Sequence, residues 1–182
     1  MTSFPVHTLD SAPDRSKPAL RQLQSAFGMI PNIAGAMATS PVLINSLVGL
    51  FANVHGGFFT EAQVQTVLLT DAVTNASTWA VAFHTALSLK EGIDPADVRA
   101  IRERRLPNDA KLAALSALAK TMIEKRGRLD DQDVDRFIAA GFDKDHALAV
   151  IAIVAASTIT NYTGSLTKTP LEPALQSHAW AP

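Results

Sequence analysis

Glycine and proline divide this sequence into long uninterrupted segments. Neither residue occurs in 58–91, 108–126 or 142–163, and each of these stretches is rich in alanine, leucine and other helix-forming residues. The apolar residues recur at helical spacing, and no run alternates between apolar and polar residues as a half-buried strand does. The sequence therefore predicts an all-α fold.

Capping residues predict where the helices begin, because Ser, Thr, Asn or Asp stands ahead of most of the segments. We expect Asn75 to end one helix in the left-handed conformation and Ser77 to cap the next. A single domain over 1–182 is predicted, with an N-terminal arm at 1–16 and a C-terminal tail at 170–182 that is extended or forms a short helix. Helices are predicted over 14–27, 32–37, 41–54, 60–74, 77–90, 94–104, 108–127, 130–141 and 143–162.

Cysteine is absent, which excludes thiol catalysis, disulfides and metal sites built on thiolates. Sixteen Lys and Arg residues oppose seventeen Asp and Glu residues, so no strong field attracts nucleic acid or an anionic membrane. We therefore expect no nucleic-acid partner, and no metal or cofactor is predicted. The first fifteen residues have neither the basic start nor the apolar segment of a secretory signal, which predicts a cytoplasmic protein.

The most apolar predicted helices indicate which partners to expect, a membrane or further copies of the chain. The longest apolar run, 147–156, is half of the roughly 20 residues that a bilayer span needs, so it predicts a buried helix and no membrane partner. Segments 64–73 and 147–159 are apolar on more than one face. A chain of this size buries one or two such helices, which favours a homo-oligomer (dimer, trimer or hexamer) over a well-packed monomer.

His84 is the most informative single residue. It lies in the middle of a predicted helix, on the same face as Ser77 and Ala80, because residues three, four and seven apart stack along one side. Ser77 is about 10 Å away along the axis, too far for a nucleophile and its base. Asp71 is a candidate carboxylate partner for His84, on grounds of proximity alone. A core histidine held by one hydrogen bond is the alternative.

His55 and the two glycines that follow it superficially match an esterase oxyanion loop. No G-x-S-x-G turn and no strand precede any serine, so the end of a helix explains this tripeptide better.

The stretch FTEAQVQTVLLTDAVTNASTWAVAFHTAL resembles the core of the carboxymuconolactone decarboxylase family, and specifically its alkylhydroperoxidase D (AhpD)-like branch. That branch carries a Glu, then eleven residues, then Cys-x-x-Cys-x-x-x-His. The segment FGMIPNIAGAMATSPVLINSL is similar to the peroxidase-related subgroup of the family. The resemblance covers about residues 20–90 well and the remainder more loosely. It implies an AhpD-like helical fold and, for the family, a peroxiredoxin-type antioxidant activity.

The resemblance places the family's Glu at Gln65, its two cysteines at Ser77 and Ala80, and its His at His84. Glutamine takes up no proton at neutral pH, serine forms no disulfide and alanine carries no chemistry. Three of the four catalytic positions have therefore lost their function, which predicts a peroxidase-inactive chain. Trp79 stands where the family often has an aromatic residue and is assigned to the pocket as a packing side chain.

Three functions remain open. The first is a pocket near the start of the helix at Ser77, lined by Gln65, Ser77 and His84, that binds a small acidic or polar molecule at the helix N-terminus. The second is a non-redox decarboxylase or lyase that uses His84 as a general acid or base. The third is a structural oligomer without chemistry.

Overall fold

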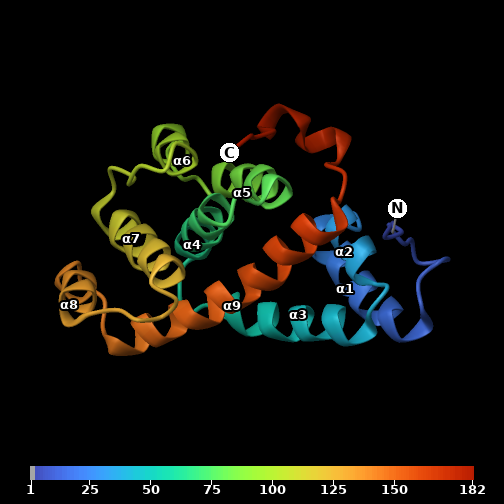
Figure 1. Ribbon diagram of the computed structural model, residues 1–182, viewed down its shortest axis with the longest axis horizontal. Helices are drawn as coiled ribbons and strands as arrows, with labels where there is room; N and C mark the ends of the chain where they lie inside the picture. The colour runs from blue at the N-terminus through green and yellow to red at the C-terminus, as the bar shows by residue number, and fades with distance from the viewer. Residues whose placement is uncertain (1–2) are drawn as a thin grey trace.

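The computed structural model describes residues 3–182, and within them the chain is all-helical, as predicted (Figure 1). The N-terminal part comprises η1 (Asp14–Ser16), α1 (Lys17–Phe27), α2 (Asn32–Met37) and α3 (Pro41–Val54). The central part comprises α4 (Glu61–Thr74), α5 (Thr78–Lys90), α6 (Pro95–Arg102), α7 (Ala110–Glu124) and α8 (Asp131–Ala139). The long α9 (Lys144–Thr167) and the 3-10 helix η2 (Pro173–His178) complete the chain.

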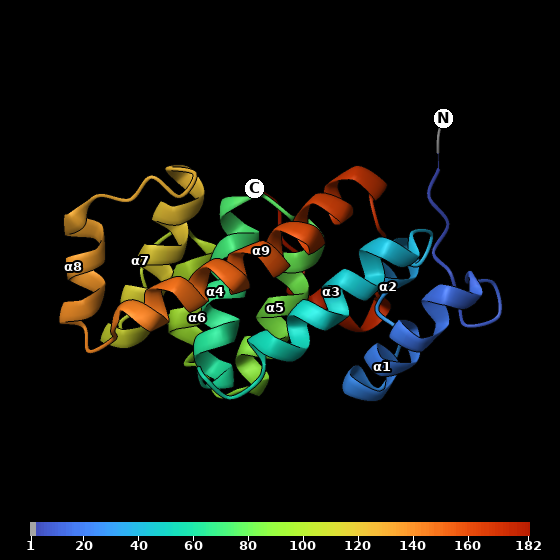
Figure 2. The same cartoon turned by 90° about the horizontal axis from the view of Figure 1, so that it is seen from below.

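Helix α9 crosses the molecule and packs against both ends of it (Figures 1 and 2). It contacts α2 and α3 on one side of the fold, α4 and α5 in the middle, and α7 and α8 at the other end. Its length and composition alone would also allow it to span a membrane. In this fold its inner face is the packing surface between two apolar cores, one with α1, α2 and α5 and one with α7 and α8.

Local capping explains most helix starts. The side chain of Thr60 accepts a hydrogen bond from the backbone of Gln63, and the Gln63 side chain accepts one from the backbone of Thr60, which forms a complete capping box at α4. Asp130 and Asp133 do the same at α8. The Ser40, Asp94, Asp109 and Asp143 side chains each cap the helix that follows them.

The connection between α4 and α5 differs from expectation. Asn75 has φ −84°, and the left-handed residue is Ala76, with φ +53°. Asn75 instead donates its side-chain amide to the backbone oxygen of Asp71, which ties it to the last turn of α4. Ser77 occupies the N-cap position of α5, but its hydroxyl makes no capping bond. It is turned toward Gly164 of α9.

Helix α9 continues five residues beyond the predicted end at residue 162. Around Gly164 the helix lies against Ile33 of α2 and Trp79 of α5, and this packing offsets the roughly 1 kcal/mol cost of a glycine within a helix. The predicted ends of the helices at 104 and 127 lie two or three residues too late, because Arg104 and Arg126 adopt positive φ and stop α6 and α7.

The C-terminal tail contains η2 and lies against α5. The guanidinium of Arg102 donates hydrogen bonds to the backbone oxygens of His178 and Ala179, and the indole of Trp180 donates to the backbone oxygen of Arg102. Arg102 is thus occupied in holding the tail. In the predicted N-terminal arm, residues 1 and 2 lie outside the described part, and Ser16 is buried with its hydroxyl bonded to the backbone of Ala38.

Candidate functional site

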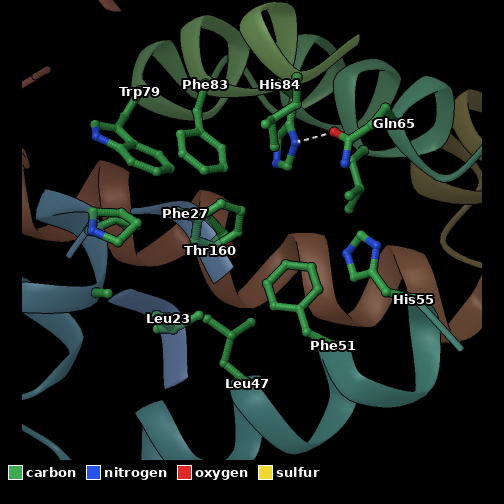
Figure 3. Close-up of a pocket in the computed structure, with 15 residues that line it drawn as sticks. Leu23, Phe27, Leu47, Phe51, His55, Gln65, Trp79, Phe83, His84 and Thr160 are labelled. Carbon is green, nitrogen blue, oxygen red and sulfur yellow. Dashed lines mark hydrogen bonds between the residues drawn. The ribbon is translucent and has the colours of Figure 1, made fainter. Parts of the chain in front are cut away.

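A cavity lies where α1, α2, α3, α4, α5 and α9 meet (Figure 3). The cavity itself has a volume of about 50 Å³, and it adjoins a larger lobe of about 330 Å³ at its mouth. Most of the side chains around it are apolar, and four of them are aromatic. The lining consists of Leu23, Phe27, Pro31, Ile33, Ala34, Leu47, Phe51, His55, Gln65, Leu68, Trp79, Phe83, His84, Leu87 and Thr160.

Three aromatic rings form one wall. The rings of Trp79 and Phe83, one turn apart on α5, are stacked with their centroids 4.7 Å apart. Phe27 of α1 meets the edge of Phe83 at 5.3 Å. The indole of Trp79 donates a hydrogen bond to Glu172 of the tail at 2.9 Å, and the other carboxylate oxygen of Glu172 accepts from the backbone of Asn32. The tail therefore fixes the orientation of the Trp79 ring.

The polar end of the cavity is the pair of His84 and Gln65. Nδ1 of His84 lies 3.0 Å from Oε1 of Gln65, and both side chains are buried. Burial lowers the pKa of His84 to about 3, and the nearby His55 acts in the same direction. His84 is therefore neutral at pH 7. Because the amide oxygen can only accept, Nδ1 carries the hydrogen and Nε2 is left as an acceptor.

The cavity opens into a second, more polar lobe. This lobe shares Leu23, Phe27, Phe51, His55, Gln65 and Leu87 with the inner cavity, and it adds the charged side chains of Glu61, Lys90 and Glu91. Nδ1 of His55 lies 2.8 Å from the Glu61 carboxylate. In Figure 3, Phe51 and His55 project from α3, opposite the α5 side chains, and Gln65 and His55 lie at the same end. The mouth thus carries a histidine and carboxylate pair.

Four of the residues predicted for the site separate into two groups. Gln65, Trp79 and His84 line the cavity, whereas Ser77 does not. Ser77 is the N-cap residue of α5, and its buried hydroxyl, turned toward Gly164 of α9, has no hydrogen-bond partner among the described residues. The cavity runs along α5 from Trp79 in its first turn to Leu87, so its lining begins just after Ser77 and does not include that residue, unlike the lining expected from sequence.

Ala80 and Asp71 are also buried outside the cavity. Six residues separate Asp71 from Gln65 on α4, a rotation that carries its side chain about 120° away from the cavity face. Among the described residues, neither carboxylate oxygen of Asp71 has a hydrogen-bond partner, and burial raises the pKa of this carboxyl well above its usual value. Asp71 is therefore not the partner of His84.

The residues that sequence reasoning missed are His55 and Glu61. The three-residue segment that begins at His55 does end a helix, as predicted, since α3 stops at Val54 and Gly57 has φ +88°. Its role in the cavity depends on the angle between α3 and α4, which places Glu61 against the imidazole. Spacing in the sequence carries no signal for this contact.

No protein-family model matches the sequence, and no curated protein matches it. The fold matches the structure of an alkylhydroperoxidase AhpD core, an uncharacterized peroxidase-related protein from Ralstonia eutropha JMP134. The TM-score is 0.83 over 94% of this chain and 93% of that chain, at 16% identity. A peroxidase-related protein from Silicibacter sp. TM1040 matches with a TM-score of 0.78 over 96% and 95% of the two chains, at 17% identity.

A third match is a cysteine-to-alanine variant of the debrominase Bmp8 in complex with 2,3,4-tribromopyrrole. Its TM-score is 0.81 over 98% of this chain and 95% of that chain, at 16% identity. Likenesses at this level of identity establish the fold. The chain has the all-α fold of AhpD-core, peroxidase-related proteins, without a single cysteine.

Proposed function

We propose that this protein binds a small, flat, uncharged aromatic molecule in the space formed by the cavity and its mouth lobe, with the polar group of that molecule held by His84 and Gln65. The observation that carries the proposal is the composition of the lining: an aromatic wall ends in one neutral hydrogen-bonding pair. Apolar pockets with a few placed polar groups are the usual form of small-molecule sites. Nε2 of His84 accepts a hydrogen bond, so an O–H or N–H group on the ligand suits it.

A thiol peroxidase activity is not part of the proposal. The chain has no cysteine, and the two positions that resemble the family's thiols, Ser77 and Ala80, are buried outside the cavity. The chemistry that the fold supports in cysteine-containing relatives therefore has no nucleophile here.

The pocket argues for a neutral ligand over the acidic one expected from sequence. Among the described residues, no lysine or arginine lines the inner cavity, so a ligand that enters as an anion would meet no permanent cation there. A polar ligand that is not charged fits the same lining.

Binding is also favoured over a lyase that uses His84 as its acid or base. A general base works best when its pKa lies near the working pH, and the pKa of His84, about 3, leaves it a weak base. The Bmp8 complex supports an aromatic ligand, because that protein holds a small flat ring in the same fold.

Isothermal titration calorimetry with 2,3,4-tribromopyrrole and with phenol tests the proposal. We expect both to bind the wild type and benzoate to bind at least about tenfold more weakly. Leu87, which is half-buried and lines both lobes, is changed to tryptophan to fill the cavity, and Leu87→Trp should abolish binding. Leu89→Trp is the matched control, because Leu89 is exposed on the same helix and lies outside the lining. Equal binding by the two variants contradicts the proposal.

A further inference from the structure

The pair of His55 and Glu61 gives the mouth of the cavity a group that the inner cavity lacks. The His55 side chain is 31% exposed and the Glu61 side chain 42% exposed, so both reach solvent while His55 also borders the inner cavity. A carboxylate oxygen can only accept, so Nδ1 of His55 carries the hydrogen and Nε2 is the free nitrogen. The ring also lies against Phe51, with centroids 5.4 Å apart, which limits its rotation.

This arrangement suits proton transfer. A carboxylate on one ring nitrogen fixes the tautomer, and it stabilises the positive charge that forms when the other nitrogen takes up a proton. His84 has no such partner, since Gln65 is neutral and the site is buried. Of the two histidines that line the cavity, only His55 has a carboxylate on its ring.

Gln65 places a hydrogen-bond donor between the two histidines. Its Oε1 faces His84, and the amide nitrogen is turned away from that ring, as Figure 3 shows. Gln65 and His55 both border the inner cavity and the mouth lobe. A negative oxygen or nitrogen formed on a ligand beside His55 would therefore have the Gln65 amide as a donor.

We propose that His55, held by Glu61, is the proton acceptor for a weakly acidic aromatic ligand such as a phenol or an N–H azole. This inference rests on the proposed function, because it requires that such a molecule occupies the cavity. When the acidic group of the ligand faces His55 in place of His84, its O–H or N–H bond breaks, the proton joins Nε2 of His55, and the electron pair stays on the ligand as an anion. The imidazolium lies between that anion and the Glu61 carboxylate, and the Gln65 amide donates to the anion.

The other charged groups at the mouth are Lys90 and Glu91 at the end of α5. Neither forms an ion pair among the described residues, and each is exposed, so water screens its charge. The His55 and Glu61 pair is the hydrogen-bonded one, and it is the group expected to decide the protonation state of the ligand.

The test uses 4-nitrophenol, whose visible absorbance is strong only when it is ionised. Calorimetry first measures binding to the full chain at a pH where the free compound is mostly un-ionised. Absorbance then reports the ionised fraction of the bound compound. We expect the wild type to lower the apparent pKa of bound 4-nitrophenol by about one pH unit or more. His55→Gln and Glu61→Gln should bind it while losing that effect.

Two controls separate the inference from the proposed function. 4-Nitroanisole cannot ionise, so the wild type and His55→Gln should bind it equally. His178→Gln removes a histidine whose side chain lies outside both lobes, and it should behave as the wild type. If neither nitro compound binds, the proposed function fails. If both bind but His55→Gln ionises bound 4-nitrophenol as the wild type does, the function stands and His55 is not the proton acceptor.

Discussion

Nδ1 of His84 donates to Oε1 of Gln65 across 3.0 Å, between the middle of α5 and the first turns of α4. The two side chains are 3% and 4% exposed, so the contact replaces water for both. A neutral amide in this place leaves the imidazole without a counter-charge. Burial, with no charged group on the ring, keeps His84 neutral at pH 7.

Gln65→Glu should raise the pKa of His84 from about 3 by about 1–3 pH units, because a carboxylate favours the imidazolium. NMR titration of the histidine ring signals measures this, with the His84 signal assigned by its loss in His84→Gln. His178→Gln serves as a control that leaves the His84 titration unchanged. A pKa for His84 that is the same with glutamine and glutamate at position 65 contradicts the pairing.

The stability of the protein should depend on pH through His84. Its pKa lies at about 3 in the folded chain and near 6.5 in the unfolded chain, so between these values the unfolded state binds more protons. This contribution is complete above pH 6.5 and is lost as the pH falls, at up to about 1.4 kcal/mol per pH unit. Urea unfolding of the wild type and His84→Gln at several pH values measures it. The difference between the two free energies should shrink or reverse toward pH 4.

Asp71 should act in the opposite direction. Burial raises its pKa in the folded chain, so above pH 3.8 the unfolded state holds fewer protons there and stability falls as the pH rises. Asp71→Asn keeps the shape and removes the ionisation. We expect the variant to gain stability over the wild type as the pH rises above about 4, by at most about 1.4 kcal/mol per pH unit. Urea midpoints at three pH values check this, and a gain independent of pH would falsify the assignment of a buried neutral carboxyl.

Sequence reasoning predicted most of this fold because its signals are local. Most helices begin directly after a Ser, Thr, Asn or Asp, as expected, and the capping box of Thr60 and Gln63 acts within one turn of α4. The misplaced features depend on docking between helices. Ala76 takes the left-handed conformation expected of Asn75, and α9 continues through Gly164 because neighbouring helices support it.

The candidate site shows the same division. The resemblance places Gln65 and His84 in one pocket, and in the structure both line the cavity and contact each other from two helices. His55 and Glu61 lie on two helices whose angle is set by the core, so no motif in this sequence reveals them. The prediction that Ser77 caps α5 is wrong for a related reason. Its hydroxyl makes no capping hydrogen bond and is turned toward Gly164 of α9.

Restoring the lost residues tests the register of the resemblance. The wild type should show no thiol-dependent turnover of a hydroperoxide, because it has no cysteine. The triple change Gln65→Glu, Ser77→Cys and Ala80→Cys should introduce turnover, since residues three apart on a helix are close enough for a disulfide. The double change at Ser77 and Ala80 alone is the matched control, and it should be slower. Turnover by the wild type contradicts the prediction.

The outer face of α9 predicts association with a second copy of the chain. Leu148, Ile151, Tyr162 and Leu166 are 51–70% exposed, and with the exposed Ala155 they fall within about 60° of one another around the helix axis. The stripe is about 27 Å long, and a two-fold axis across it would pair the same face with itself.

Sedimentation velocity should show an oligomer, and Leu148→Lys with Leu166→Lys should shift it to the monomer without loss of helical signal. Lys144→Leu, at the exposed start of the same helix, is the control that should leave the oligomer intact. A wild type that sediments as a monomer at high concentration contradicts this prediction.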